Sequence, residues 1–85
     1  MRWYRLAAEQ GFAESQTNLG LSYALGEGVP QDNVYAHMWW NIVASTGDDD
    51  ARANKKIVEK KMTTIDISEA QRLARECVKK NYKGC

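Results

Sequence analysis

Residues 12–47 read FAESQTNLGLSYALGEGVPQDNVYAHMWWNIVASTG, and this stretch decides the predicted fold. Its first part, residues 13–25, places five residues at spacings of three, four and one, which makes one helix face. These residues are Ala13, Gln16, Leu19, Gly20 and Tyr23. The glycines and the proline of residues 26–32 interrupt that helix. A second apolar stripe then runs over about 33–46 and ends at Gly47. Its members are Tyr35, Ala36, Trp39, Trp40, Val43 and Ala44. The stretch therefore predicts a two-helix hairpin.

Two residues of the hairpin carry further expectations. Gly20 lies on the apolar face, where glycine costs up to ~1 kcal/mol in helix propensity relative to alanine. We expect a neighbouring helix to approach so closely there that a Cβ atom would clash. Asp32, or Asn33 beside it, is expected to cap the second helix.

The hairpin belongs to an internal repeat. A shift of 36 residues aligns several pairs of like residues: Trp3 with Trp39, Tyr4 with Trp40, Ala8 with Ala44, Gly11 with Gly47, and Asn18 with Asn54. Intervals of this size are typical of helical solenoids, whose hairpin units cannot bury their apolar faces alone. We therefore expect an all-α solenoid of about one and a half repeats in one domain, residues 1–85.

The predicted units follow in order along the chain. Residues 1–11 are the second helix of a truncated repeat, 12–47 a complete repeat, 48–62 the helix of an altered last repeat, 63–80 a capping helix, and 81–85 a tail. Thr63 with Asp66 three residues later resembles a capping box, which predicts the start of the last helix.

The altered repeat departs from the pattern at three positions. Lys55, Lys56 and Glu59 stand where the complete repeat has Leu19, Gly20 and Tyr23. One interpretation is a polar cap, which the ends of solenoids need for solubility. The alternative is a slip in helical register, in which a different set of residues packs: Asn54, Ile57, Val58 and Met62.

Segments of this sequence resemble the Sel-one-like repeat (SLR) family, a relative of the tetratricopeptide repeat. The resemblance lies in WYRLAAEQG (3–11), AESQTNLG (13–20) and YALGEGVPQD (23–32), with Ala36 and Trp39 after them. Residues 62–75 are similar to the closing helix of bacterial members. The resemblance implies a right-handed α/α superhelix of antiparallel hairpins, which acts as an adaptor and gathers other proteins on its concave face. No catalytic activity belongs to the repeats of this family.

The resemblance also implies a binding face, because the first helix of each hairpin lines the concave side. Its outward positions in the complete repeat are Glu14, Thr17, Leu21, Ala24 and Leu25. Leu21 and Leu25 are four residues apart and lie off the packing face, so they can form an exposed apolar strip beside a carboxylate. Such a strip suits an amphipathic or extended peptide. The alternative is that a neighbouring repeat of a longer protein covers it.

Charge is divided unevenly along the chain. Residues 1–50 carry two basic and seven acidic side chains, a net charge of −5, whereas residues 51–85 carry ten basic and four acidic ones, a net charge of +6. Two halves of one domain can attract each other in this way. The alternative is electrostatic binding of nucleic acid or an anionic membrane through the basic half. Nucleic acid is disfavoured because Tyr82 is the single aromatic residue among the lysines, and stacking needs several.

No motif predicts an enzyme, a metal site or a bound cofactor. His37 is the sole histidine and lacks the further ligands that zinc requires. The glycines at 26 and 28 follow a helix and lack the remaining parts of a dinucleotide or phosphate loop. The acidic run at residues 48–50 lacks the spacing of a calcium loop. A protein or peptide partner is therefore predicted, with no small-molecule substrate. No apolar run is long enough to span a membrane.

Cys77 and Cys85 leave two possibilities open. The residues between them include Gly84, so the tail can fold back and close a disulfide loop, which an oxidising compartment would favour. In the cytosol, Cys77 would be a small core residue. Many SLR proteins look exported, which favours the bridge and a periplasmic or secreted location.

The N-terminal half-hairpin, residues 2–10, lacks a partner helix of its own. Its open apolar end predicts a weak homodimer at high concentration.

Overall fold

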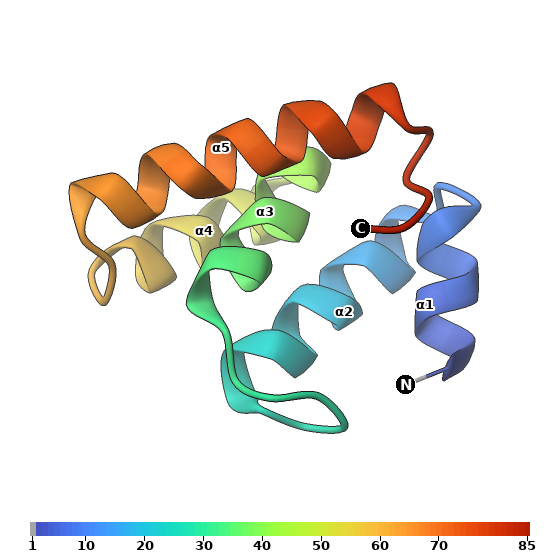
Figure 1. Ribbon diagram of the computed structural model, residues 1–85, viewed down its shortest axis with the longest axis horizontal. Coiled ribbons are helices and arrows are strands. Elements are labelled where there is room, and N and C mark those ends of the chain that lie inside the picture. Colours follow the sequence, from blue (N-terminus) through green and yellow to red (C-terminus); the bar gives the residue numbers. More distant parts are fainter. Residues whose placement is uncertain (1) are drawn as a thin grey trace.

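The computed structural model describes the backbone of residues 2–85 and the side chains from Arg5 onward. Within this range the chain forms five α-helices and no strand, as Figure 1 shows. The helices are α1 (Arg2–Glu9), α2 (Ala13–Leu25), α3 (Asn33–Ala44), α4 (Asp49–Glu59) and α5 (Thr64–Lys79). The predicted all-α architecture is confirmed.

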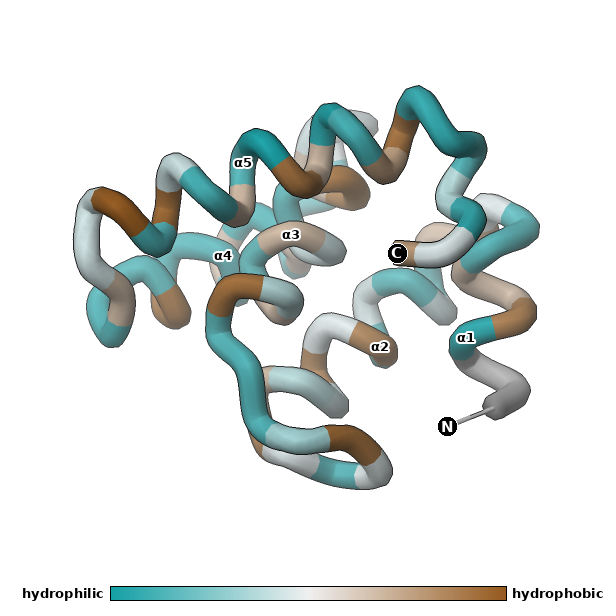
Figure 2. The backbone as a smooth tube through the Cα atoms, in the orientation of Figure 1, coloured by the Kyte–Doolittle hydropathy of each residue, from teal (hydrophilic) through white to brown (hydrophobic). Residues whose placement is uncertain are grey.

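Helix α3 is the centre of the molecule. It packs against α2, α4 and α5, whereas α1 packs against α2. Figure 1 shows α5 along one edge and the α1–α2 pair along another, with α3 between them. Figure 2 shows the same division by hydropathy, because α5 is teal on its outer side and brown at many positions that face inward. Most of α3 is buried as a result: Ala36, His37, Met38, Trp39, Trp40, Ile42, Val43 and Ala44.

Gly20 brings α2 and α3 into close contact. A Cβ atom built on Gly20 would lie 2.7 Å from Nε1 of Trp40 and 2.9 Å from its Cδ1. The indole N–H donates a hydrogen bond of 3.1 Å to the carbonyl oxygen of Thr17, one turn earlier on α2. The close approach expected from the sequence is therefore present. The indole ring lies against bare backbone and is held there by a backbone acceptor.

The helix ends follow local capping chemistry. The carboxylate of Asp32 accepts from the backbone N–H groups of Val34 and Tyr35, so Asp32 rather than Asn33 caps α3. Helix α3 ends at Ala44, two residues before the predicted end. The hydroxyls of Ser45 and Thr46 donate to the carbonyl oxygens of Ile42 and Val43 in the last turn, where the regular backbone hydrogen bonds of the helix run out.

The cap of α5 has the form expected from the sequence. The side chain of Thr63 accepts from the N–H of Asp66, and the carboxylate of Asp66 accepts from the N–H of Thr63. The predicted capping box is confirmed.

Helix α4 combines features of both interpretations of the altered repeat. Ala51 and Val58 are buried, and Met62 packs against the cluster that contains Val58. The register-slip interpretation also placed Ile57 in the packing. That prediction is wrong, because the Ile57 side chain is 58% exposed. Glu59 turns back to α3, where its carboxylate lies 2.7 Å from Nε2 of His37.

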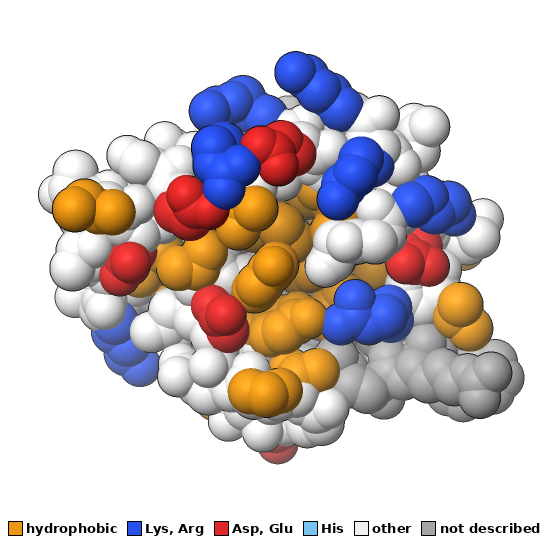
Figure 3. Space-filling model, viewed as in Figure 1, with side chains coloured by type: hydrophobic (Ala, Val, Ile, Leu, Met, Phe, Trp, Pro, Cys, Tyr) orange, Lys and Arg blue, Asp and Glu red, His pale blue; other side chains and the backbone are white. Residues whose placement is uncertain are grey.

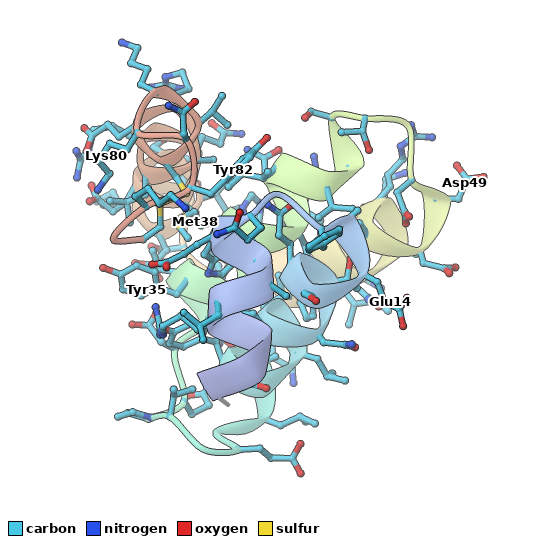
Figure 4. All side chains as sticks on the ribbon, turned by 90° about the vertical axis from the view of Figure 1, so that its right-hand side faces the viewer. Glu14, Tyr35, Met38, Asp49, Lys80 and Tyr82 are labelled. Carbon is cyan, nitrogen blue, oxygen red and sulfur yellow. A yellow bond between two sulfur atoms is a disulfide. The ribbon has the colours of Figure 1, made fainter. Side chains whose placement is uncertain are left out.

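The C-terminal tail joins the first and last helices. Cys85 forms a disulfide with Cys77 of α5. Lys83 donates to the carbonyl oxygen of Glu9 at 3.1 Å, and the N–H of Gly84 donates to the Glu9 carboxylate at 3.4 Å. Figure 4 shows Tyr82 between α5 and the turn after α1, and Tyr82 Cε2 would lie 3.3 Å from a Cβ atom on Gly11. The tail therefore ties α1 to α5.

Gly20→Ala tests the contact with Trp40. The added methyl group must displace the indole and weaken its hydrogen bond to Thr17, so we expect a loss of about 1–3 kcal/mol in unfolding free energy, despite alanine's better helix propensity. Urea denaturation followed by circular dichroism measures it. In a Trp40→Leu background the same substitution should be neutral or stabilising. An equal loss in both backgrounds would contradict the contact.

Glu59→Leu tests the link between α3 and α4. His37 is fully buried, and its Nε2 would lose its acceptor, so we expect a loss of about 1–3 kcal/mol in unfolding free energy. Glu59→Gln keeps a carbonyl acceptor of the same reach and should recover most of this loss in the same urea assay. If Gln and Leu are equally destabilising, the hydrogen bond contributes nothing.

Reduction tests the tail. Opening the loop between Cys77 and Cys85 should lower the unfolding free energy by about 2 kcal/mol, because the unfolded chain regains freedom. The check is urea denaturation with and without dithiothreitol. Cys85→Ser should show the same loss and no response to the reductant. A Cys85→Ser protein as stable as the oxidised protein would disprove the stabilising role.

Candidate functional site

A groove of about 200 Å³ lies between α2 and α4, with α3 beneath it. Its walls come from the first helices of two successive hairpins, and its floor comes from the second helix of the complete repeat. The residues that line it are Leu21, Ala24, Leu25, Asn33, Trp40, Asn54, Ile57, Val58 and Lys61. The 36-residue repeat therefore creates this groove, since two copies of one helix stand beside each other across α3.

Three large apolar side chains stand in the walls and remain in contact with water. Leu21 is 44% exposed and Leu25 is 59% exposed on α2, and Ile57 is 58% exposed on α4. Trp40 forms the floor at 4% exposed, fixed by Gly20 and the Thr17 carbonyl. A rigid aromatic floor between apolar walls can bury the apolar side chain of a partner without rearranging.

Polar groups border the same groove. Asn54 on α4 makes no side-chain hydrogen bond to any residue that the structure describes, so its amide is free to donate and accept. Asn33 already accepts a bond of 2.8 Å from Gln31. Lys61 is the one charged residue of the lining. The groove can therefore hold an apolar side chain, pair with a peptide group and attract an acidic residue.

The structure divides the five predicted site residues into two groups. Leu21, Ala24 and Leu25 line the groove together. Glu14 is exposed on the first turn of α2 and lies outside the lining, directed away from the molecule in Figure 4. Thr17 also lies outside it, and its carbonyl oxygen serves the Trp40 indole.

The opposite wall was missed as a binding surface. In the sequence analysis, Ile57 and Val58 on α4 were considered only as packing residues. The pairing of Asn18 with Asn54 in the repeat was the available signal, because it assigns α4 the same place in its hairpin as α2.

The two cysteines lie away from this groove. Their Cα atoms are 5.7 Å apart in the disulfide that closes the tail. In the described part of the chain, no three His, Cys, Asp or Glu side chains are arranged to hold a metal ion. None of the described helices combines the length and apolar character needed to cross a membrane.

Comparison with known proteins agrees with the repeat. The family model of the Sel1 repeat matches residues 1–12 and 13–48. The fold is similar to the crystal structure of a protective antigen present in uropathogenic Escherichia coli strains, which displays an SLR fold, with a TM-score of 0.85 and 30% sequence identity. That match covers 94% of this chain but 18% of the antigen's chain, so this chain spans under a fifth of the antigen. No curated protein sequence matches. More than half of the chain fits the family model, and the chain belongs to the Sel1 repeat family.

Proposed function

We propose that this chain is a non-catalytic interaction module that binds a peptide segment of another protein in the α2–α4 groove. One observation carries the proposal: half-exposed apolar side chains of two successive repeats face each other across Trp40. Membership of a family of protein-interaction repeats supports the same function.

The size of the groove limits the affinity. Complete burial of a leucine or isoleucine side chain is worth about 1.5–3 kcal/mol, and Leu21, Leu25 and Ile57 are already about half buried. Together they offer ~3 kcal/mol, and burial of one or two apolar side chains of the peptide adds about as much again, from which the ordering of the peptide must be subtracted. A short peptide is therefore expected to bind this chain with a dissociation constant from high micromolar to millimolar. A longer array of repeats would add further contacts of the same kind.

The polar residues set the chemistry of the peptide. The free amide of Asn54 suits a backbone peptide group, which offers both a donor and an acceptor. Lys61 favours a carboxylate at the end of the groove where α4 stops. The proposed ligand is an extended segment with one or two apolar side chains followed by an acidic residue.

The proposal includes an oxidising compartment, periplasmic or extracellular. The disulfide between Cys77 and Cys85 supports it, because such bonds persist outside the reducing cytosol.

Peptide display tests the groove. Random peptides are selected on the immobilised chain, and their affinities are measured by fluorescence titration. The double substitution Leu21→Glu and Leu25→Glu should weaken them at least about tenfold, because it puts charges into the apolar wall.

The matched control is Leu6→Glu with Ile65→Glu. These side chains are 48% and 80% exposed and lie outside the groove, so the control makes the same change in charge and should bind normally. Equal losses of peptide affinity in the two double variants would contradict the proposal that the peptide binds in the α2–α4 groove. If the ligands bind only at low salt, and neither double variant changes their affinity, the function would instead be electrostatic binding through the basic half, residues 51–85.

A further inference from the structure

A second groove lies on the opposite side of α3, between α3 and α5. It measures about 380 Å³ and is lined by Asn41, Ile42, Ser45, Ala74, Arg75, Val78 and Lys79. The lining residues come from the last turn and C-cap of α3 and from a short stretch of α5, so adjacent faces of these two helices form the groove. It shares no lining residue with the α2–α4 groove.

The floor of this groove is apolar. Ile42 is 5% exposed and Ala74 is 4% exposed, so they close the floor, and Val78 stands on the α5 wall at 49% exposed. Val78 is thus a large apolar side chain left half in water beside an apolar floor. A partner that covers it gains hydrophobic stabilisation without opening the fold.

The walls are positively charged. Arg75 and Lys79 are one turn apart on α5, both are exposed, and neither pairs with any residue in the described part of the chain. The nearby acids are already engaged, because Glu69 and Glu76 both bind Arg72 and their hydrogen bonds raise its pKa. On the α3 side, Asn41 accepts from Lys55.

No acidic residue lines the groove, so these cations are not compensated locally. Figure 3 shows Lys and Arg side chains along the α5 edge of the molecule.

We propose that the α3–α5 groove docks an amphipathic acidic helix of a partner protein. Residues 75 and 79 repeat at the spacing of one helical turn, which matches two carboxylates four residues apart on a facing helix. Apolar residues between those carboxylates would cover Val78 and the floor of Ile42 and Ala74. The charge and the apolar strip therefore select the same ligand, in the helix-in-groove mode of recognition.

Other anionic partners fit this groove less well. Nucleic acid binding without sequence preference uses aromatic stacking, and no aromatic side chain lines this groove. An anionic membrane presents a broad surface, whereas the apolar residues Ile42 and Ala74 lie at the bottom of a groove. A protein helix reaches that floor with its own side chains.

The test uses a designed helical peptide with leucines on one face and glutamates flanking them. It is titrated into the full oxidised chain labelled with ¹⁵N, followed by NMR. We expect saturable shifts at Ile42, Ser45, Ala74 and Val78, with residues of the α2–α4 groove unaffected. The same peptide with every glutamate replaced by glutamine should bind at least about fivefold more weakly, because it loses its charge pairs.

Two matched charge variants of the protein separate the groove from general attraction. Arg75→Gln with Lys79→Gln should weaken the acidic peptide about fivefold to tenfold. Lys56→Gln with Lys60→Gln removes the same charge at the same spacing from exposed positions at the C-terminal end of α4 and should change binding less than about twofold. Val78→Gln should weaken both the acidic and the glutamine peptide, since it removes an apolar contact.

Several results would overturn the proposal. These are equal effects of the two double variants, shifts confined to the α2–α4 groove, or no saturation up to about 1 mM peptide. Phosphatidylglycerol vesicles that bind with the same dependence on Arg75 and Lys79, while the peptide does not, would assign the groove to a lipid surface instead. Leu21→Glu with Leu25→Glu should leave this peptide's affinity unchanged, so the two grooves can fail independently.

Discussion

The enclosure of α3 by three other helices is the constraint on which this structure depends. Eight of its 12 residues are buried, and it contributes to both grooves. Trp40 and Asn33 lie beneath the space between α2 and α4, and Ile42 lies beneath the space between α3 and α5. The contact between Trp40 and Gly20 fixes the depth of the first groove, because any larger residue at position 20 would displace the indole. The two surfaces are therefore opposite sides of one buried helix.

The polar residues of the last repeat have a structural explanation in the preceding one. Tyr23 on α2 accepts a hydrogen bond of 2.8 Å from Arg5 on α1. Glu59, its counterpart in the repeat, bonds to His37 on α3. In both repeats this position makes a polar contact with the helix before it. Glutamate in place of tyrosine thus keeps a polar contact with the preceding helix, although the chemical groups differ. This contact helps α4 to pack on α3 as α2 packs on α1.

Much of the fold was predictable from local signals. The helical periods, the Asp32 cap, the Thr63 capping box and the close approach at Gly20 all depend on residues near in sequence or on one missing side chain. The grooves depend on contacts between helices, so only part of them could be predicted. Leu21, Ala24 and Leu25 were placed from one helix, but Ile57 and Val58 are neighbours across the groove only after α4 has packed on α3. The exposure of Ile57 also depends on how α4 is rotated about its own axis. The mixed polar and apolar pattern of the α4 sequence did not determine that rotation.

The C-terminal tail changes how the chain is expected to fold and unfold. Contacts in a solenoid are mostly local, so an array of hairpins can fray from either end one unit at a time. Here Lys83 and Gly84 bond to Glu9 across separations of 74 and 75 residues, and the disulfide holds that segment against α5. Asn81 and Tyr82 adopt left-handed backbone angles, φ 55° and 66°, a costly conformation that these surrounding contacts must maintain. Fraying of α1 then requires the far end of the chain to release as well. This closure makes a short array behave as a single cooperative unit rather than as a row of separable repeats.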